Sequence, residues 1–463
     1  MVKRMPTVIL IIFIATIMSF SFLISGTVAA AMSDSAEVGA NRSAVETEPQ
    51  TAYRLVTAPE VMVYGSGNGE AYYTIQPNND NSYSIFRTDY VKKQQDYLCN
   101  DPDCSHDSVS CSCRIEAYPG IVFPAALEDR LVLVYSSYDV PREGRVPSKV
   151  ETMNLDGTGR KVVCTFPSDV YVSTGVATDN KSIVLVIHRM EYGDDRVNVI
   201  YSLVRVDLET GEKEELYSTY AGEGELIKSF FIRGATKEGF VLKTITTKEY
   251  DDQGSFEEVD EACRMATTHE IFLLPYDDNS SPRLLLKYTQ DDAYEKVYGE
   301  QLVCYLNEGG TYRLKTIDIT TGEEETVIDD FSAKGMSSIQ NRRFGDTFIY
   351  GFVDGHVLLN HLYEDHYLEN GDIELLYTQY AVDLTTGEWT EVTLSDYYMV
   401  AKHALILLSE NNDQILTYHV EESGNKLVYQ QKMIATEDYL NSEGTFSSVD
   451  QPVYMTSPGY AVK

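Results

Sequence analysis

Four cysteines and one histidine lie close together in the stretch "LCNDPDCSHDSVSCSC", residues 98–113. Three thiolates and an imidazole form a complete tetrahedral ligand set for Zn²⁺, and the spacing Cys99-x4-Cys104-x-His106-x4-Cys111 supplies them. A closed set of four protein ligands is typical of a structural site, because no coordination position stays open for a substrate. The spacing therefore predicts one structural zinc ion.

Disulfide bonds are the alternative at the same place. Two bridges among Cys99, Cys104, Cys111 and Cys113 would suit an oxidising compartment equally well. His106 favours the metal, since a disulfide pair does not need an imidazole, whereas a metal needs a fourth ligand. Thiolates must also stay reduced to hold a metal, so both interpretations remain open, with redox chemistry as a third.

Two acidic stretches, 248–263 and 361–374, supply a second group of candidates. Carboxylates beside tyrosines would suit a cation or a sugar ring. Neither stretch has the D-x-[DN]-x-[DN]-G spacing of a calcium loop, so we favour the simpler interpretation of solvated loops with scattered charges. The ligand-binding candidates are Tyr250, Asp251, Asp252, His361, Tyr363, Glu364, Asp365 and His366.

The elements that position these residues follow from a repeated hairpin. Five copies occur, at 83–99, 150–164, 201–217, 312–328 and 377–394, and looser copies at 270–288 and 415–433 complete a set of seven. In four of the five an Asp is followed by a Gly-containing turn such as "DLETG" or "DLTTG", where glycine tolerates positive φ. We interpret each hairpin as the two outer strands of a unit.

Another apolar run precedes each hairpin except the first, and one more short strand lies upstream of several. Four strands recurring along the chain are typical of β-propeller blades. We therefore predict an all-β chain with one propeller of seven four-stranded blades, with six or eight as the alternative counts. The strands at "AYRLVTAPE" and "PVYMTSPGYAVK" are expected to share one blade and close the ring.

The hairpins ending in "NLDGTG" or "DLTTGE" resemble the blades of TolB-type bacterial propellers over 51–463. The cluster "LCNDPDCSH" with Cys111 resembles one that follows the first blade in uncharacterised exported propellers of Gram-positive, Firmicutes-type bacteria. The resemblance implies the architecture and an exported protein, but no particular activity. Cys113 is not part of the pattern that this resemblance implies.

The N-terminus is typical of an export signal. Lys3 and Arg4 precede an apolar run from Val8 to Ile24, and small residues follow with a cleavage site after Ala31. We expect residues 1–31 to be a signal peptide or an uncleaved anchor, 32–50 a flexible linker, and 51–463 the propeller. The protein is then secreted or held at the cell surface, with membrane contact only through an uncleaved N-terminal segment.

The net charge of −35 argues against nucleic acid as a partner, because binding it requires basic side chains. No G-x-S-x-G, H-E-x-x-H or P-loop motif is present, and we assign no catalytic residue. The preferred hypothesis is a non-catalytic binding module for a glycan, peptide or envelope partner. The alternatives are a carbohydrate-active hydrolase or lyase using two channel-mouth carboxylates, and a protein assembly scaffold. The long connections between second and third strands, at 137–149, 190–198, 247–268 and 360–376, should open on one face with the cysteine cluster.

Overall fold

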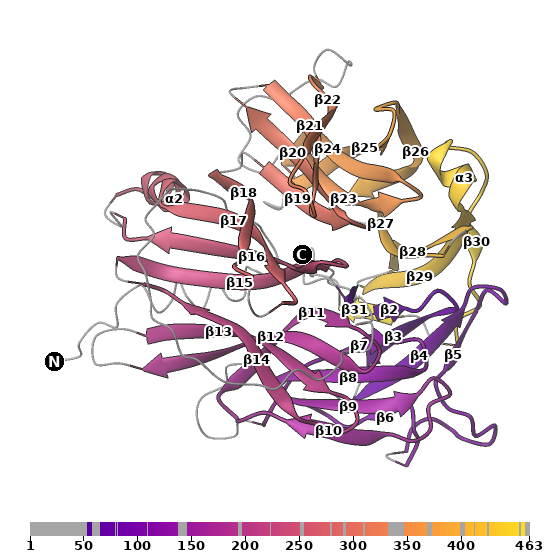
Figure 1. Ribbon diagram of the computed structural model, residues 1–463. Coiled ribbons are helices and arrows are strands. Elements are labelled where there is room, and N and C mark those ends of the chain that lie inside the picture. The colour runs from indigo at the N-terminus through magenta and orange to yellow at the C-terminus, as the bar shows by residue number, and fades with distance from the viewer. Residues whose placement is uncertain are drawn as a thin grey trace.

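The computed structural model describes most of the chain from Tyr53 onward as seven antiparallel sheets arranged around an axis, with indigo blade one beside yellow blade seven (Figure 1). The described residues are 53–57, 65–78, 80, 82–108, 110–137, 146–192, 197–222, 224–250, 254–277, 280–289, 293–308, 311–331, 347–367, 373–398, 403–411, 413–423, 426–452 and 455–458. The predicted seven-bladed propeller is confirmed.

Each of the first four blades is built from consecutive strands in the order inner to outer. Blade one contains β2 (Gly65–Gly67), β3 (Ala71–Pro77), β4 (Tyr83–Asp89) and β5 (Gln94–Tyr97), with β6 (Arg114–Ile115) also on β4. Blade two contains β7 (Gly120–Ala126), β8 (Arg130–Ser137), β9 (Lys149–Asn154) and β10 (Lys161–Thr165). Blade three contains β11 (Val170–Thr178), β12 (Ser182–Tyr192), β13 (Val197–Asp207) and β14 (Lys213–Tyr220). Blade four contains β15 (Glu225–Ala235), β16 (Gly239–Lys248), β17 (Thr267–Pro275) and β18 (Arg283–Thr289), with helix α2 (Phe256–Met265) between β16 and β17.

The last three blades follow the same order. Blade five contains β19 (Ala293–Tyr298), β20 (Gln301–Glu308), β21 (Thr311–Asp318) and β22 (Glu324–Ile328). Blade six contains β23 (Thr347–Val353), β24 (His356–Tyr367), β25 (Ile373–Asp383) and β26 (Trp389–Tyr398). Blade seven contains β27 (His403–Asn411), β28 (Gln414–Ser423), β29 (Lys426–Ala435), helix α3 (Thr436–Leu440), β30 (Ser447–Ser448) and β31 (Met455–Pro458).

The repeated hairpins form the two outer strands in blades one to six, as predicted. Blade seven is different, because the copy at 415–433 supplies the second and third strands, β28 and β29. Its outer strand is split into β30 and β31, which pair with different parts of β29. The prediction for this last hairpin was therefore wrong by one strand.

Two ends of the ring can be distinguished from the strand order. We call the end that carries the connections between blades and the links between second and third strands the loop face. The opposite end, with the other hairpin turns, is the turn face. The four long stretches predicted for one face do all link second and third strands, but 190–198 and 360–376 are mostly extensions of paired strands. They are projecting hairpins rather than loops.

The aspartates of the repeat cap the outer turns. Asp207 Oδ1 accepts hydrogen bonds from the backbone N–H groups of Glu209 and Thr210, at 2.9 and 2.7 Å. Asp318 and Asp383 accept equivalent pairs of hydrogen bonds in blades five and six. The side chain replaces backbone partners that the turn cannot supply, which explains why Asp recurs there.

The glycines of these turns also approach the preceding blade. Gly211 has φ +74°, and a Cβ there would overlap the backbone oxygen of Val163 in β10. Gly157 and Gly387 also have positive φ. A Cβ at Gly157 would overlap the backbone oxygen of Leu98 in blade one, and a Cβ at Gly387 would overlap that of Val327 in blade five. Glycine is needed twice over, for its conformation and because the turn packs against a neighbouring backbone.

The apolar core is divided among the interfaces between neighbouring blades. One cluster joins blades one and two, and the others join each following pair around the ring. The last, with Tyr72, Leu416 and Met433, joins blade seven to blade one. Backbone hydrogen bonds reinforce this closure, because Gln95 N donates to Asp450 O at 2.8 Å and Asp450 N donates to Lys93 O at 2.9 Å. Burial of apolar surface between blades therefore holds the ring together.

We expected the N-terminal and C-terminal strands to share one blade, but strand β1 (Arg54–Thr57) lies in a different blade from the C-terminal strand. It adds to the inner edge of blade three, where Arg54 pairs with Thr178. It also contacts β2, β7 and β15, so it lies inside the ring. Because Thr178 ends β11 at the turn face, β1 begins on that side of the ring.

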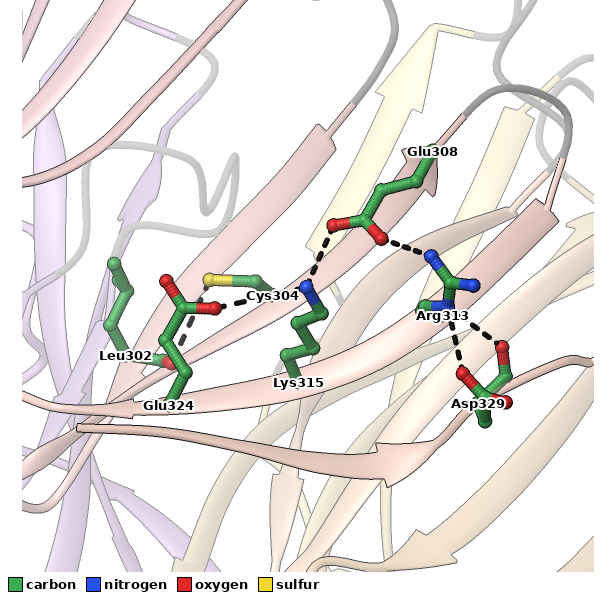
Figure 2. A network of polar contacts seen from close by, with 7 residues as sticks. All are labelled: Leu302, Cys304, Glu308, Arg313, Lys315, Glu324 and Asp329. Carbon is green, nitrogen blue, oxygen red and sulfur yellow. Dashed lines mark hydrogen bonds and ion pairs between the residues drawn. The ribbon is translucent and has the colours of Figure 1, made fainter.

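Charged side chains on blade five are shared among several partners. Lys315 Nζ lies 2.7 Å from Glu308 and 3.7 Å from Glu324, and Arg313 pairs with both Glu308 and Asp329 (Figure 2). Because acidic side chains outnumber basic ones in this chain, each of these two cations pairs with two carboxylates. Such exposed pairs contribute little to stability individually.

In the part of the chain that the structure describes, neither α2 nor α3 has the length and hydrophobicity that a membrane-spanning helix requires.

Candidate metal centre and the loop face

The cysteine loop is an excursion from the outer edge of blade one. Leu98 N donates to Ile85 O, and Ile85 N donates to Cys113 O, both at 2.9 Å, so one residue of β4 holds both ends of the loop. After the loop, β6 returns to β4. The cluster lies after β5 and before blade two, as predicted, and β6 shows that this connection pairs once more with blade one.

The four predicted ligands come together in the structure. One ligand atom each from Cys99, Cys104, His106 and Cys111 lies within 4.8 Å of all the others. His106 Nδ1 is 3.6 Å from Cys111 Sγ. In a tetrahedral zinc site with Zn–S bonds of about 2.3 Å, the ligand atoms lie about 3.8 Å apart. The donor set and its separation therefore fit a zinc ion after a contraction of less than about 1 Å.

His106 is held in position by its neighbours. Its backbone has φ +59°, which is uncommon for a residue other than glycine, and its N–H donates to Cys104 Sγ at 3.4 Å. Its ring stacks on Tyr97 at 4.3 Å between centroids. The tight turn and the stacked ring together direct the imidazole toward the three thiols.

The thiols influence one another's protonation. Burial opposes ionisation of Cys99, but hydrogen bonds from the Asp101 backbone and the neighbouring thiols outweigh it and lower its pKa. The His106 N–H lowers the pKa of Cys104, but the Cys111 thiol and burial raise it to about 11. Burial raises the pKa of Cys111 to about 11 as well. A bound cation would supply the charge that allows all three to ionise.

Cys113 lies beside the cluster but outside the set of four. It is buried, and its Sγ is 3.2 Å from Cys111 Sγ. Burial raises the pKa of its thiol. All seven cysteines lie in the described part of the chain, and all carry free thiols.

The acidic stretch 248–263 folds differently from the solvated loop that we expected. Its second half is helix α2, which lies at one end of blade four (Figure 1). Ser255 begins the helix with a capping box, in which Ser255 Oγ accepts from Glu258 N and Glu258 Oε2 accepts from Ser255 N. The S-x-x-E pattern was the signal that could have predicted this helix. Tyr250 is half-buried between β16 and α2, while Asp251 and Asp252 lie outside the described residues.

The candidates of 361–366 lie on β24, in blade six. His361 is buried, and its ring centroid is 6.4 Å from that of Tyr380. The backbones of Glu364, Asp365 and His366 pair with β25, and Tyr363 falls at an irregularity of the register. Blade five separates these residues from Tyr250, so the structure does not bring the two candidate groups together.

Two buried carboxylates were not found from the sequence. Among the described residues, Glu151 and Glu295 are the acidic side chains that are buried. Glu295 of blade five pairs with Lys243 at 2.8 Å and Arg233 at 3.3 Å, both from blade four. Glu151 lies in blade two, 2.6 Å from Lys149 and 2.8 Å from the Arg160 guanidinium, which also donates to Arg114 O of blade one. They belong to different blade interfaces and so do not form the facing pair that a glycosidase needs.

The similarity of this chain to known proteins is low. No family model matches the sequence, and no curated protein matches it. Among solved structures, oligopeptidase B from Leishmania major is 10% identical with a TM-score of 0.44, over 87% of this chain and 49% of that chain. The propeller domain of the trilobed protease from Pyrococcus furiosus is 11% identical with a TM-score of 0.40, over 86% and 98%. A putative TolB from Agrobacterium tumefaciens is 13% identical with a TM-score of 0.26, over 63% and 84%.

This chain thus spans about half the length of the oligopeptidase B chain. At such identities the likeness concerns the fold alone.

Proposed function

We propose that this protein is an exported, non-catalytic β-propeller that binds a partner at the cell envelope through its loop face. The observation that carries the proposal is the asymmetry of the ring. The loop face receives helix α2 and the adjoining ends of the long strand pairs β12–β13 and β24–β25. In blades one to six, the turn face carries mostly short turns such as 179–181 and 208–212. Binding residues tend to lie on variable connections held by a rigid scaffold.

Export follows from the sequence signal, and secretion or surface attachment depends on whether residues 1–31 are removed. The test of binding is a screen of the purified protein against glycans and peptides, run beside an assay for polysaccharide turnover. We expect binding without turnover. Turnover together with no ligand in the screen would overturn the proposal.

We also propose that Cys99, Cys104, His106 and Cys111 hold one structural zinc ion, as their ligand types and spacing suggest. Three thiols and an imidazole within 4.8 Å support this assignment. Zinc would join the two halves of an excursion that Ile85 otherwise holds only at its base. Its role would then be to fix the conformation of the loop, not to react.

Metal analysis of protein purified without oxygen tests the zinc assignment. We expect about one zinc per chain, lost in Cys104→Ser and His106→Ala. Cys113→Ser is the matched control, because its sulfur lies beside the cluster but outside the four ligands, and this variant should keep the metal. Protein without zinc whose cluster thiols do not react with a thiol reagent would instead support disulfides.

A further inference from the structure

Three exposed apolar side chains lie at the loop-face ends of blades three and four. Tyr220 is 63% exposed, Met265 48% and Leu226 42%. Tyr220 ends β14, Leu226 lies at the start of β15, and Met265 is the last residue of α2. We call these three residues the blade-four patch. Exposed apolar side chains that cluster on one face are typical of interaction sites.

Backbone hydrogen bonds hold the segments of the patch side by side. Glu249 N donates to Gly224 O at 3.1 Å, which ties the connection before β15 to the chain that leaves β16. Lys248 N donates to Ala266 O at 2.8 Å, which ties the same place to the end of α2. Leu226 falls at a bulge between two paired positions of β15 and β16. In Figure 1 the ends of blades three and four where β12 meets β13 and where β16 leads to α2 lie on the same side of the molecule.

The other large apolar side chains that are exposed among the described residues do not join this group. Val91 lies in the β4–β5 turn on the turn face, Val146 shortly before β9, Val162 on β10 and Leu284 on β18. They lie singly at different places on blades one, two and four, and scattered apolar side chains are ordinary on a protein surface.

The border of the patch is acidic. Among the described residues it includes Glu249 after β16 and Glu258, Asp260 and Glu261 on α2. Glu249 and Glu258 are exposed. Of the nearby cations, Arg264 is paired with Glu261, and Lys248 is the exposed one beside Glu249.

We infer that the blade-four patch docks a basic polypeptide segment that also carries apolar side chains. This inference rests on the proposed function and names its partner class. Carboxylates around the apolar residues attract a cationic partner and repel anionic lipid or nucleic acid. Tyr220, Leu226 and Met265 would then supply the contact area that charge alone does not give.

The test measures fluorescence anisotropy of a labelled peptide that alternates Lys and Leu in a helical pattern. One comparison peptide has Glu in place of Lys, and the other has Ser in place of Leu. We expect the Lys/Leu peptide to bind the purified full chain most tightly, with an affinity that falls as salt rises. The double variant Tyr220→Ser with Met265→Ser should weaken binding about tenfold or more, and Glu249→Lys should reduce the salt dependence.

Val91→Ser is the matched control, because it removes an exposed apolar side chain on the opposite face, and it should bind as the unchanged protein does. Tyr220→Phe should keep binding if the double variant lost it through contact area rather than misfolding. Equal affinity in the patch variants, or equal binding of the Glu/Leu peptide, would overturn the inference. Binding of a glycan but of no peptide would overturn it too, while leaving the proposed function intact.

Discussion

The Tyr288 hydroxyl donates a hydrogen bond to Glu295 Oε2 at 2.5 Å while it accepts one from Lys243 Nζ at 2.7 Å. Tyrosine, carboxylate and cation thus form a buried triad between blades four and five. Blade two repeats the arrangement, where Tyr135 donates to Glu151 at 2.8 Å and accepts from Arg160 at 2.5 Å. The two triads satisfy buried polar groups at two interfaces that are otherwise apolar.

Replacement of Glu295 by Gln should destabilise the protein strongly. It would leave Lys243 and Arg233 close together in a buried site without their carboxylate, which costs about 3–5 kcal/mol. Calorimetry should show a melting temperature several degrees lower. Glu308→Gln, in the exposed network of Figure 2, is the control and should cost less than about 1 kcal/mol. Equal losses in both variants would contradict the importance of burial.

Gly211→Ala should destabilise the ring more than Gly69→Ala. Both glycines have positive φ, +74° and +87°, so both variants pay backbone strain of about 1 kcal/mol or more. Only at Gly211 would the new methyl group also overlap the Val163 backbone, because nothing lies within 4 Å of a Cβ at Gly69. The comparison by thermal unfolding separates strain from packing between blades. A similar loss in both variants would show that the turn moves freely away from blade two.

The turn aspartates should make the protein sensitive to acid. Backbone hydrogen bonds, first that from Thr210, lower the pKa of Asp207, and Thr321 and Thr386 do the same for Asp318 and Asp383. Since a lowered pKa favours the charged form in the folded state, stability is complete above about pH 4 to 5 and is lost as the pH falls through the folded pKa values.

Asp207→Asn tests this contribution. The amide oxygen can still accept both backbone hydrogen bonds, so at pH 7 we expect a smaller loss than in Asp207→Ala, which removes them at a cost of about 1 kcal/mol. The asparagine variant should also lose less stability than the unchanged protein between pH 5 and 3. An unchanged acid slope would show that Asp207 does not contribute.

His269→Phe should reduce the loss of stability between pH 7 and 5. Burial, with Lys243 and Arg233 nearby, lowers the pKa of His269 well below its usual value. The ring therefore stays neutral when folded, whereas the unfolded chain takes up a proton below about pH 6.5, so stability falls with pH. Neither ring nitrogen has a hydrogen-bond partner among the residues that the structure describes, and the ring stacks on Tyr288 at 4.7 Å, which a phenyl group can also do.

His419→Phe gives a second instance of the same effect. Burial lowers the pKa of His419 to about 4, and its ring meets Phe446 at 4.5 Å. The two substitutions should flatten the profile of melting temperature against pH additively, because the residues lie in different blades. A double variant with the original slope would contradict both assignments.

The parts of this fold that the sequence predicted are those with a local signature. The turns at Asp207, Asp318 and Asp383 recur because a capping side chain and a glycine lie a few residues apart. The four metal-ligand candidates lie within one short loop, so their spacing was enough to predict that they come together. Outer strands of ordinary length also followed from alternation, except in blade seven, where β30 has two residues and offers no pattern.

Contacts between blades could not be predicted in this way. Lys243 binds Glu295, which lies 52 positions later in the sequence. The alternation of residues within a strand does not indicate which side chain of the neighbouring blade will lie opposite. Strand β1 was assigned to the wrong blade because its apolar pattern suits any free edge, and packing inside the ring selected β11. Helix α2 was hidden by its many charges, although Ser255 and Glu258 marked its beginning.

The route of β1 through the ring has a mechanical consequence. Arg54 begins β1 at the turn face, so a force that pulls the chain out of the ring at Tyr53 would act along this strand. The force would load the pairing of β1 with β11 in shear, while Tyr53, hydrogen-bonded to Ser182 and in contact with the Phe240 ring, resists withdrawal. The first strand would bear tension before any blade does.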